Sequence, residues 1–455
     1  MKQTITQNKH LRRAAEWFYF KASGSLRYDY WKMLEKTQYL SIDQLRSIQR
    51  RRLRNMLDYV YHNNCFYRQR FDSVGIRPAD IREPRDLKKL PVLTKAQVRQ
   101  NADKLLSRNA GANHLIKFKT GGSTGKALEF FISEPCSELR NALARRHDRW
   151  SGWEIGEPVA AIWGNPVYPK GFKETVVNWI VSPNIYLDTM SVTDDSVRAF
   201  VGQWEKVGPT LIFGHAHSIF LLSQHLDRLN IRHLRPKGII SSSMMLLPHE
   251  RHFIERIFHT KVTNRYGCEE VSLIASECEQ HSGMHVNMEH LVVEVLKDDG
   301  SDAAPGELGH IVVTDLMNRA MPFIRYRVED MGVLSERVCP CGRGLPLMDN
   351  VAGRVADFLV RNDGSQVAGI SLIENTLTRI PGLDQMQIIQ ESRDHLSLNL
   401  VGSTKFTESR KKELLYYFKT IFGANAMIDV NMVDHIAPES SGKYRFSICR
   451  ILNPE

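Results

Sequence analysis

The sequence predicts an α/β protein with one large domain followed by a smaller α+β domain. The chain has 455 residues, more than a single hydrophobic core normally supports. Between about residues 115 and 350, short apolar runs alternate with stretches of helical periodicity, a pattern typical of an α/β body. The alternation restarts after Gly353-Arg354. We therefore place a domain boundary between residues 353 and 354.

Residues 1–110 are predicted to form a mostly helical first part of the large domain. After a Ser41/Gln44 capping box, apolar residues recur at helical spacing from Leu45 to Val60. The basic run 50–54 lies within this helix and, with a net charge of +10, raises nucleic-acid or anionic-membrane binding as alternatives. We assign these arginines to the solvated face of a packed helix, since no nucleic-acid-reading motif is recognisable.

Residues 111–353 are predicted to be the α/β core of the large domain. Helices are expected at 193–206, 216–229 and 248–258. The predicted strands are Val159–Trp163, Thr210–Phe213, Gly238–Ser241, Leu291–Leu296 and His310–Thr314.

Residues 354–455 are predicted to be a small lid domain. The expected order is a strand at Phe358–Arg361, a helix near 371–380, strands near 385–391 and 395–401, a helix at 407–421 and a strand at 427–433. This order suggests a ferredoxin-like arrangement.

The composition is that of a soluble globular protein, with 42% hydrophobic and 25% charged residues. No apolar run approaches the roughly 18 residues of a membrane helix, and the first residues lack the apolar core of a signal peptide. We expect a cytoplasmic protein. Seven cysteines, an odd and sparse number, favour reduced thiols over a disulfide framework.

A loop rich in glycine and hydroxyl groups, Lys119-Thr120-Gly121-Gly122-Ser123-Thr124-Gly125-Lys126, indicates phosphate binding. Glycine lets backbone N–H groups approach phosphate oxygens closely, and the lysine adds a positive charge. A Walker loop would need glycine and a hydroxyl residue where this chain has Thr120 and Ala127, so we exclude a Walker ATPase. An ordinary turn between strands is the alternative for the loop alone.

Further motifs follow in order along the chain. They are Tyr266-Gly267-Cys268-Glu269-Glu270, Arg325–Asp330, Gly353–Asp357 and Pro438–Lys443, with Pro91–Lys95, Gly306–Asp315, Asn318–Pro322 and Cys339–Arg343 as supporting phrases. Together with the Thr120 loop they resemble the motifs of the adenylate-forming (AMP-binding) superfamily. The resemblance covers about residues 30–450 and is strongest to its phenylacetate–CoA ligase and CapK branch.

The resemblance implies an ATP-binding site. The loop of Thr120, Gly121, Gly122, Ser123, Thr124, Gly125 and Lys126 would clamp the β- and γ-phosphates. Tyr266 and Gly267 would lie near the adenine, and Glu270 would hold Mg²⁺, which prefers carboxylate oxygens. A surface Glu-Glu pair at a helix start is the alternative for Glu270.

The resemblance also gives roles to residues nearer the C-terminus. Asp330 would accept hydrogen bonds from the ribose hydroxyls, and Arg354 would contact ribose or phosphate, with a structural salt bridge as the alternative. Lys443 would bridge the attacking carboxylate and the α-phosphate, although lysines on such loops are usually only solvated. Lys443 and Glu270 are the predicted catalytic residues.

The chain departs from the family pattern at several positions. Glu269 replaces a hydroxyl residue, Val328-Glu329 replaces Thr-Gly, and Met244-Met245 stands where many relatives have a glutamate. His215 and His217 fall where relatives place the wall of the acyl pocket.

A structural zinc site is a separate hypothesis. Cys278, His285, Cys339 and Cys341 offer thiolate and imidazole ligands that suit Zn²⁺, and some relatives of this branch carry zinc on similarly placed residues. The spacing is not a standard finger pattern, so buried reduced cysteines remain the alternative.

The resemblance implies ATP-dependent activation of a small carboxylic acid as acyl-AMP, followed by transfer to coenzyme A. An amine acceptor in polysaccharide or natural-product tailoring is the second hypothesis, and an inactive nucleotide-binding scaffold is the third. Lys126, Glu270, Asp330 and Lys443 are all present, which argues against the scaffold. We expect no nucleic-acid partner and no transmembrane segment. A homodimer is one possible assembly that the sequence leaves open.

Overall fold

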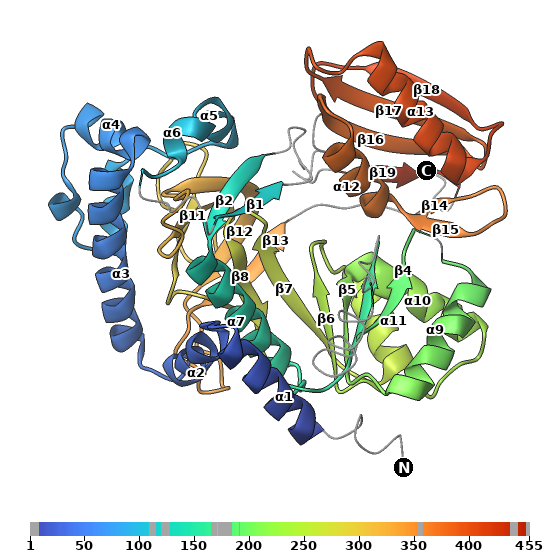
Figure 1. Ribbon diagram of the computed structural model, residues 1–455, viewed down its shortest axis with the longest axis horizontal. Helices are drawn as coiled ribbons and strands as arrows, with labels where there is room; N and C mark the ends of the chain where they lie inside the picture. Colours follow the sequence, from blue (N-terminus) through green and yellow to red (C-terminus); the bar gives the residue numbers. More distant parts are fainter. Residues whose placement is uncertain are drawn as a thin grey trace.

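The computed structural model describes residues 9–108, 115–119, 128–164, 171, 184–190, 192–352, 358–436 and 445–451. An eleven-stranded sheet forms the body, and a four-stranded sheet with two helices forms a smaller unit near the C-terminus (Figure 1). The predicted α/β fold with a large and a smaller part is therefore confirmed. The proposed division at 353/354 falls at residues outside the described ranges and stays a prediction.

One half of the large sheet is parallel. Its strands run in the order β4 (Asn184–Asp188), β3 (Val159–Trp163), β5 (Leu211–His215), β6 (Gly238–Ser242) and β7 (Val262–Cys268). The crossover helices α9 (Asp194–Val207), α10 (Ala216–Arg228) and α11 (Pro248–Phe258) lie within a residue or two of the predicted ranges. Apolar side chains from these strands and helices share one buried cluster.

The other half of the sheet is antiparallel and continues from β7. It comprises β8 (Ser272–Glu277), β9 (Met284–Val286), β13 (Leu347–Ala352), β12 (Tyr326–Ser335), β11 (Gly309–Asp315) and β10 (Leu291–Leu296). A separate hairpin pairs β1 (Leu115–Lys119) with β2 (Glu129–Ser133). The change from parallel to antiparallel pairing at β7 therefore falls at the Tyr266–Glu270 motif.

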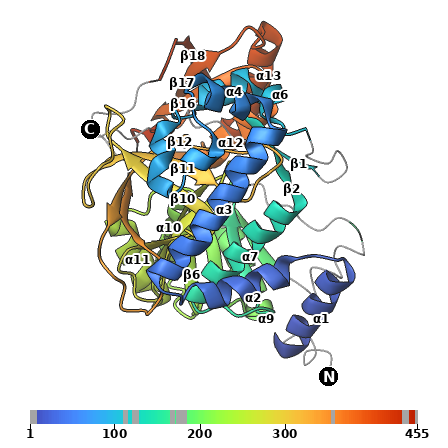
Figure 2. The same ribbon diagram turned by 90° about the vertical axis from the view of Figure 1, so that its left-hand side faces the viewer.

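Helices from the first part of the chain cover one side of this sheet (Figure 2). They are α1 (Lys9–Ala22), α2 (Arg27–Thr37), α3 (Ile42–Asn63), α4 (Cys65–Ser73), α5 (Lys95–Gln100) and α6 (Ala102–Leu105), with short 3₁₀ turns at Pro78–Asp80 and Pro84–Lys89. The Ser41/Gln44 capping box predicted for α3 is present and satisfies backbone donors at the helix start.

Helix α7 (Glu134–Trp150) is joined to the sheet by a buried ion pair. Arg146 donates to Glu289 over 2.5 Å, and neither side chain is more than 1% exposed. Glu289 also accepts a hydrogen bond from Thr37 of α2. This network fixes α7, which carries Arg140 toward the candidate site.

The C-terminal unit contains β14 (Phe358–Val360), β15 (Gln366–Ala368), α12 (Gly369–Arg379), β16 (Leu383–Ser392), β17 (His395–Gly402), α13 (Glu408–Phe422), β18 (Met427–Met432) and β19 (Ser447–Cys449). The predicted helices and the strands β16, β17 and β18 are present, but the sheet order is β18-β17-β16-β19.

The pairing of β14 differs from the ferredoxin-like expectation, because β14 pairs with β15 instead of joining the four-stranded sheet. The turn between them holds Gly364 at φ +82°, and Asp363 accepts hydrogen bonds from the backbone and hydroxyl of Ser365. An Asp-Gly turn of this kind closes a local hairpin, here between β14 and β15. The strand that pairs with β16 at the edge of the four-stranded sheet is therefore β19.

None of the helices in the described ranges is both long enough and apolar enough to cross a membrane.

Candidate active site

The tyrosine–glycine motif spans the end of β7 and the turn that follows it, with Tyr266 and Gly267 in the strand and Glu269 and Glu270 in the turn. At Gly267 a Cβ atom would lie 2.4 Å from the backbone oxygen of Ser272, so a side chain would force β7 and β8 apart. The register between these strands shifts between Tyr266 and Gly267. The glycine therefore permits a close turn that brings Glu269 and Glu270 to the end of β7.

The structure brings two of the predicted motifs into direct contact. The Tyr266 hydroxyl donates to Asp330 Oδ2 over 3.0 Å, and the Tyr326 hydroxyl donates to Glu270 Oε1 over 2.9 Å. Both Tyr326 and Asp330 belong to β12. Residues separated by about sixty positions in sequence thus form one polar group between β7 and β12.

Lys95 also reaches this group, although sequence reasoning gave it no role. Leu93 adds to β12 as a short parallel bridge, donating to the Arg325 oxygen over 2.7 Å and accepting from the Arg327 backbone N–H over 3.0 Å. Lys95, two residues later, places its Nζ 3.8 Å from Glu270 Oε1, with both side chains at most 7% exposed. This ion pair gives Glu270 a buried cationic neighbour within the polar group.

A second cation, Arg140 of α7, holds the turn from the other side. It donates to the backbone oxygens of Glu269 (3.2 Å) and Glu270 (2.7 Å) and to Asp315 Oδ2 (3.3 Å). Asp315, at the end of β11, accepts backbone hydrogen bonds from Met317 and Asn318 through its other oxygen. Since these contacts fix the backbone around Glu270, Arg140 and Asp315 are positioning residues.

The charges around the turn perturb two neighbouring groups. Burial, and then the nearby Glu270, raise the pKa of Glu269. Burial together with Glu270 and Asp330 raises the pKa of the Cys268 thiol well above its ordinary value. Carboxylates gathered in this way offer the oxygen ligands that a divalent cation such as Mg²⁺ prefers.

The remaining predicted nucleotide ligands fall outside the described residues. They are Thr120, Gly121, Gly122, Ser123, Thr124, Gly125, Lys126, Arg354 and Lys443. Their roles stay predictions.

His215 ends β5 at the carboxyl edge of the parallel strands, where ligands of open α/β sheets bind. Its side chain is fully buried, and neither ring nitrogen has a hydrogen-bond partner among the residues that the structure describes. The Trp163 ring lies against it with a centroid separation of 3.8 Å, and burial lowers the pKa of His215 to about 3. The neighbouring His217 instead pairs with Glu250 of α11.

The four predicted metal ligands converge from separate segments. Cys278 follows β8, His285 lies on β9, and Cys339 and Cys341 lie between β12 and β13. All four ligand atoms lie within 4.8 Å of one another, and this set is the one group of three or more such ligands among the described residues.

The spacing of these ligands fits a tetrahedral zinc ion. The sulfurs of Cys278 and Cys339 are 3.7 Å apart, and two thiolates bound to tetrahedral Zn²⁺ at 2.3 Å lie roughly 3.8 Å apart. His285 Nδ1 donates to the Leu345 oxygen over 3.1 Å, which leaves Nε2, 3.3 Å from the Cys341 sulfur, as the nitrogen available to a metal. A backbone carbonyl of this kind commonly orients zinc-bound histidines.

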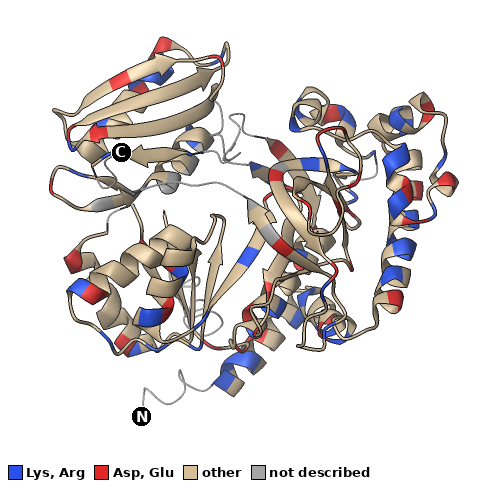
Figure 3. Cartoon of the chain, turned by 180° about the vertical axis from the view of Figure 1, so that it is seen from behind, with Lys and Arg blue, Asp and Glu red and all other residues tan. Residues whose placement is uncertain are grey.

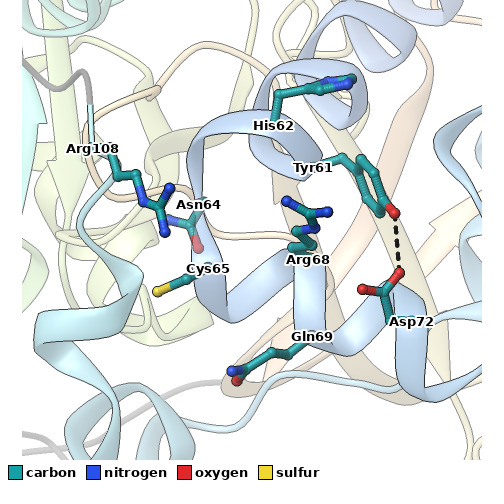
Figure 4. Close-up of a pocket in the computed structure, with 8 residues that line it drawn as sticks. All are labelled: Tyr61, His62, Asn64, Cys65, Arg68, Gln69, Asp72 and Arg108. Carbon is teal, nitrogen blue, oxygen red and sulfur yellow. Dashed lines mark hydrogen bonds between the residues drawn. The ribbon is translucent and has the colours of Figure 1, made fainter.

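A surface pocket of about 210 Å³ lies elsewhere, where α3 meets α4 (Figure 4). Arg68, Arg108 and His62 are among the residues lining it. None of the lining residues belongs to the candidate site, and nothing in its contacts indicates a ligand.

Sequence reasoning missed Arg140 and Tyr326 as parts of the site. Arg140 belongs to none of the quoted motifs, and two of its three partners are backbone oxygens that any residue supplies. Tyr326 lies inside the Arg325–Asp330 motif without an assigned role. Lys95 and Asp315 are the last residues of two of the supporting motifs. The sequence therefore pointed to both residues, but no role was assigned to either.

Comparison with known proteins places the fold. The structure resembles that of 2-hydroxyisobutyryl-CoA ligase in complex with 2-HIB-AMP and CoA in the thioesterification state. The TM-score is 0.62 at 19% identity, over 92% of this chain and 93% of that one. The fold is therefore that of the adenylate-forming CoA ligases.

Sequence comparison finds relatives in the branch of the adenylate-forming enzymes that the motifs predicted. Residues 359–450 match the family described as CapK C-terminal domain. The chain is 23% identical to Protein CapK of Staphylococcus aureus over 416 residues, covering 90% of each. It is 26% identical to phenylacetate-coenzyme A ligase of Escherichia coli strain K12 over 344 residues, covering 72% of this chain and 75% of the relative. The resemblance inferred from the motifs, to the phenylacetate–CoA ligase and CapK branch of the adenylate-forming enzymes, is thus confirmed.

Proposed function

We propose that the protein is a ligase that activates a carboxylic acid with ATP, releasing pyrophosphate, and transfers the acyl group of the resulting acyl-AMP to coenzyme A. The observation that carries the proposal is the meeting of Tyr266 with Asp330 and of Glu270 with Tyr326. These contacts bring two motifs of the adenylate-forming pattern together at the end of the parallel strands, the position where open α/β sheets bind nucleotides.

In this proposal the chain's residues divide the work of the first half-reaction. Glu270 would hold Mg²⁺ against the phosphates, and its contacts with Lys95 and Tyr326 would orient its carboxylate. Magnesium, when bound, would neutralise charge on the phosphates. Asp330 would bind the ribose. Lys443 would neutralise charge where the substrate carboxylate attacks the α-phosphorus.

We also propose that Cys278, His285, Cys339 and Cys341 hold a structural Zn²⁺. Bound there, the ion would tie the loop between β12 and β13 to β8 and β9. Because β12 carries Asp330, the same ion would support the nucleotide site indirectly.

The test of the main proposal is acid-dependent exchange of labelled pyrophosphate into ATP across a panel of carboxylic acids. We expect exchange with at least one acid and a loss of about a hundredfold in Lys443→Ala, since one transition-state donor is worth on the order of 3 kcal/mol. Lys405→Ala, which changes an exposed lysine in the same unit, is the matched control. Equal exchange in the two folded variants would refute the role of Lys443.

The acceptor is tested separately. The match of residues 359–450 to the CapK C-terminal domain family keeps an amine acceptor as the second candidate. Mass analysis after incubation with ATP, the active acid, and either coenzyme A or a mixture of amines separates a thioester from an amide.

A further inference from the structure

Helix α1 presents an unusual distribution of side chains. At 100° per residue, Arg12, Glu16 and Phe20 lie on one side of α1, Leu11 and Phe18 lie on the opposite side, and Trp17 and Tyr19 lie at the two borders between these sides. The charged side faces the protein. Arg12 and Glu16 are 7% and 3% exposed, and Arg145 of α7 donates to Glu16.

The seating of α1 on the body is close. At Gly156 a Cβ atom would lie 2.7 Å from the Lys9 backbone oxygen and 3.0 Å from the Arg13 nitrogen. Lys9 also forms an ion pair with Glu157 over 3.8 Å. The helix is therefore held by its polar side, with its apolar side turned outward.

Exposed apolar side chains concentrate on this segment. Five of the thirteen large hydrophobic side chains exposed among the described residues lie between positions 11 and 26: Leu11 (52%), Trp17 (37%), Phe18 (66%), Tyr19 (47%) and Leu26 (43%). Figure 2 shows α1 at the periphery of the molecule, beside α2. An apolar cluster of this kind on a soluble protein marks an interaction surface.

The chemistry of this surface favours an anionic lipid layer. Trp and Tyr flanking a central apolar residue are typical of the water–lipid interface. The exposed Lys21 belongs to the same helix, and the whole chain carries +10. Figure 3 shows the lysines and arginines of the chain in blue. A stable dimer generally takes roughly 20–30 residues per partner, more than this segment offers.

We propose that α1 is an interfacial helix that seats the protein on an anionic membrane surface. Phe18 enters the acyl boundary, Trp17 and Tyr19 lie at headgroup level, and Lys21 contacts lipid phosphate. The helix lies in the plane of the surface and does not cross it.

The test is co-flotation of the full chain with vesicles of phosphatidylcholine alone or mixed with phosphatidylglycerol. We expect flotation with the anionic vesicles, a decrease with rising salt, and a loss of roughly tenfold or more in Phe18→Glu. Tyr416→Glu, which changes an aromatic residue 73% exposed on α13, is the matched control and should float like the parent. Circular dichroism and pyrophosphate exchange without vesicles should be unchanged in both variants.

Any of three results would overturn the proposal. The first is that the parent chain stays in solution with anionic vesicles, and the second is that Phe18→Glu floats as well as Tyr416→Glu does. The third is that light scattering finds a dimer which Phe18→Glu dissociates, because the surface would then bind a second copy. If the parent chain shows no pyrophosphate exchange, that result would contradict the proposed ligase function and would leave the flotation test unaffected.

Discussion

Replacing Tyr326 by phenylalanine removes one hydroxyl group from the candidate site and leaves the ring in place. The lost bond runs over 2.9 Å to Glu270 Oε1, with Tyr326 and Glu270 only 1% and 5% exposed. A hydrogen bond to a charged group contributes about 1.5–3 kcal/mol. Since Lys95 remains 3.8 Å from the same oxygen, we expect the lower end of that range, about 1.5 kcal/mol or roughly tenfold.

If Glu270 binds Mg²⁺, the midpoint for magnesium in pyrophosphate exchange should rise by about tenfold in Tyr326→Phe, as removal of groups that orient metal ligands usually does. The matched control is Tyr61→Phe, which removes a hydroxyl–carboxylate bond of 3.0 Å to Asp72 (Figure 4). That bond is solvent-exposed, so its loss should leave the magnesium midpoint unchanged. Melting curves of both variants separate a folding defect from a binding defect. Identical magnesium midpoints in the two variants would show that the carboxylate oriented by Tyr326 does not bind the metal.

Three further predictions concern the metal, the hinge and the buried ion pair. Elemental analysis should find about one zinc per chain, and Cys339→Ser with Cys341→Ser should lower the melting temperature; absent zinc with chelator-insensitive melting would leave only buried thiols. The family resemblance implies that the small domain pivots at the residue after Gly353-Arg354-Val355, which is Ala356 in this chain. Ala356→Pro should therefore slow thioester formation more than pyrophosphate exchange; equal effects on both would exclude that role. Glu289→Gln should cost roughly 3–5 kcal/mol at pH 7, because it leaves Arg146 buried without its charge partner. Burial alone would raise the pKa of Glu289, but Arg146 lowers it overall below the ordinary 4.5. Its contribution is therefore complete above pH 4.5 and lost as the pH falls through the lowered value. Denaturant unfolding should show the parent–variant difference shrinking in acid, and a constant difference would contradict the ion-pair argument.

The sequence by itself determined the fold class and most of the elements. Helices α9, α10 and α11 and strands β3 and β10 follow from hydrophobic periodicity, which reports directly on which side of an element is buried. The Ser41/Gln44 box set the start of α3, because capping is a local interaction between residues three apart. The motifs also predicted that Tyr266, Glu270 and Asp330 share one site, and the contacts among β7, the turn after it and β12 bring them together.

Only the tertiary structure decided which side chains surround Tyr266, Glu270 and Asp330. Lys95 meets Glu270 because Leu93 adds to β12, and Arg140 meets the same turn because the Arg146–Glu289 pair fixes α7. Such pairings join residues more than a hundred positions apart, and neither periodicity nor capping encodes them. The sequence analysis did not predict that β14 pairs with β15. The pairing partner of a strand depends on which other strand edges lie next to it in the folded chain, and the pattern within one strand does not specify this. The exposure of the apolar side of α1 is likewise decided by the tertiary structure, because the side that carries Arg12 and Glu16 packs against the rest of the protein.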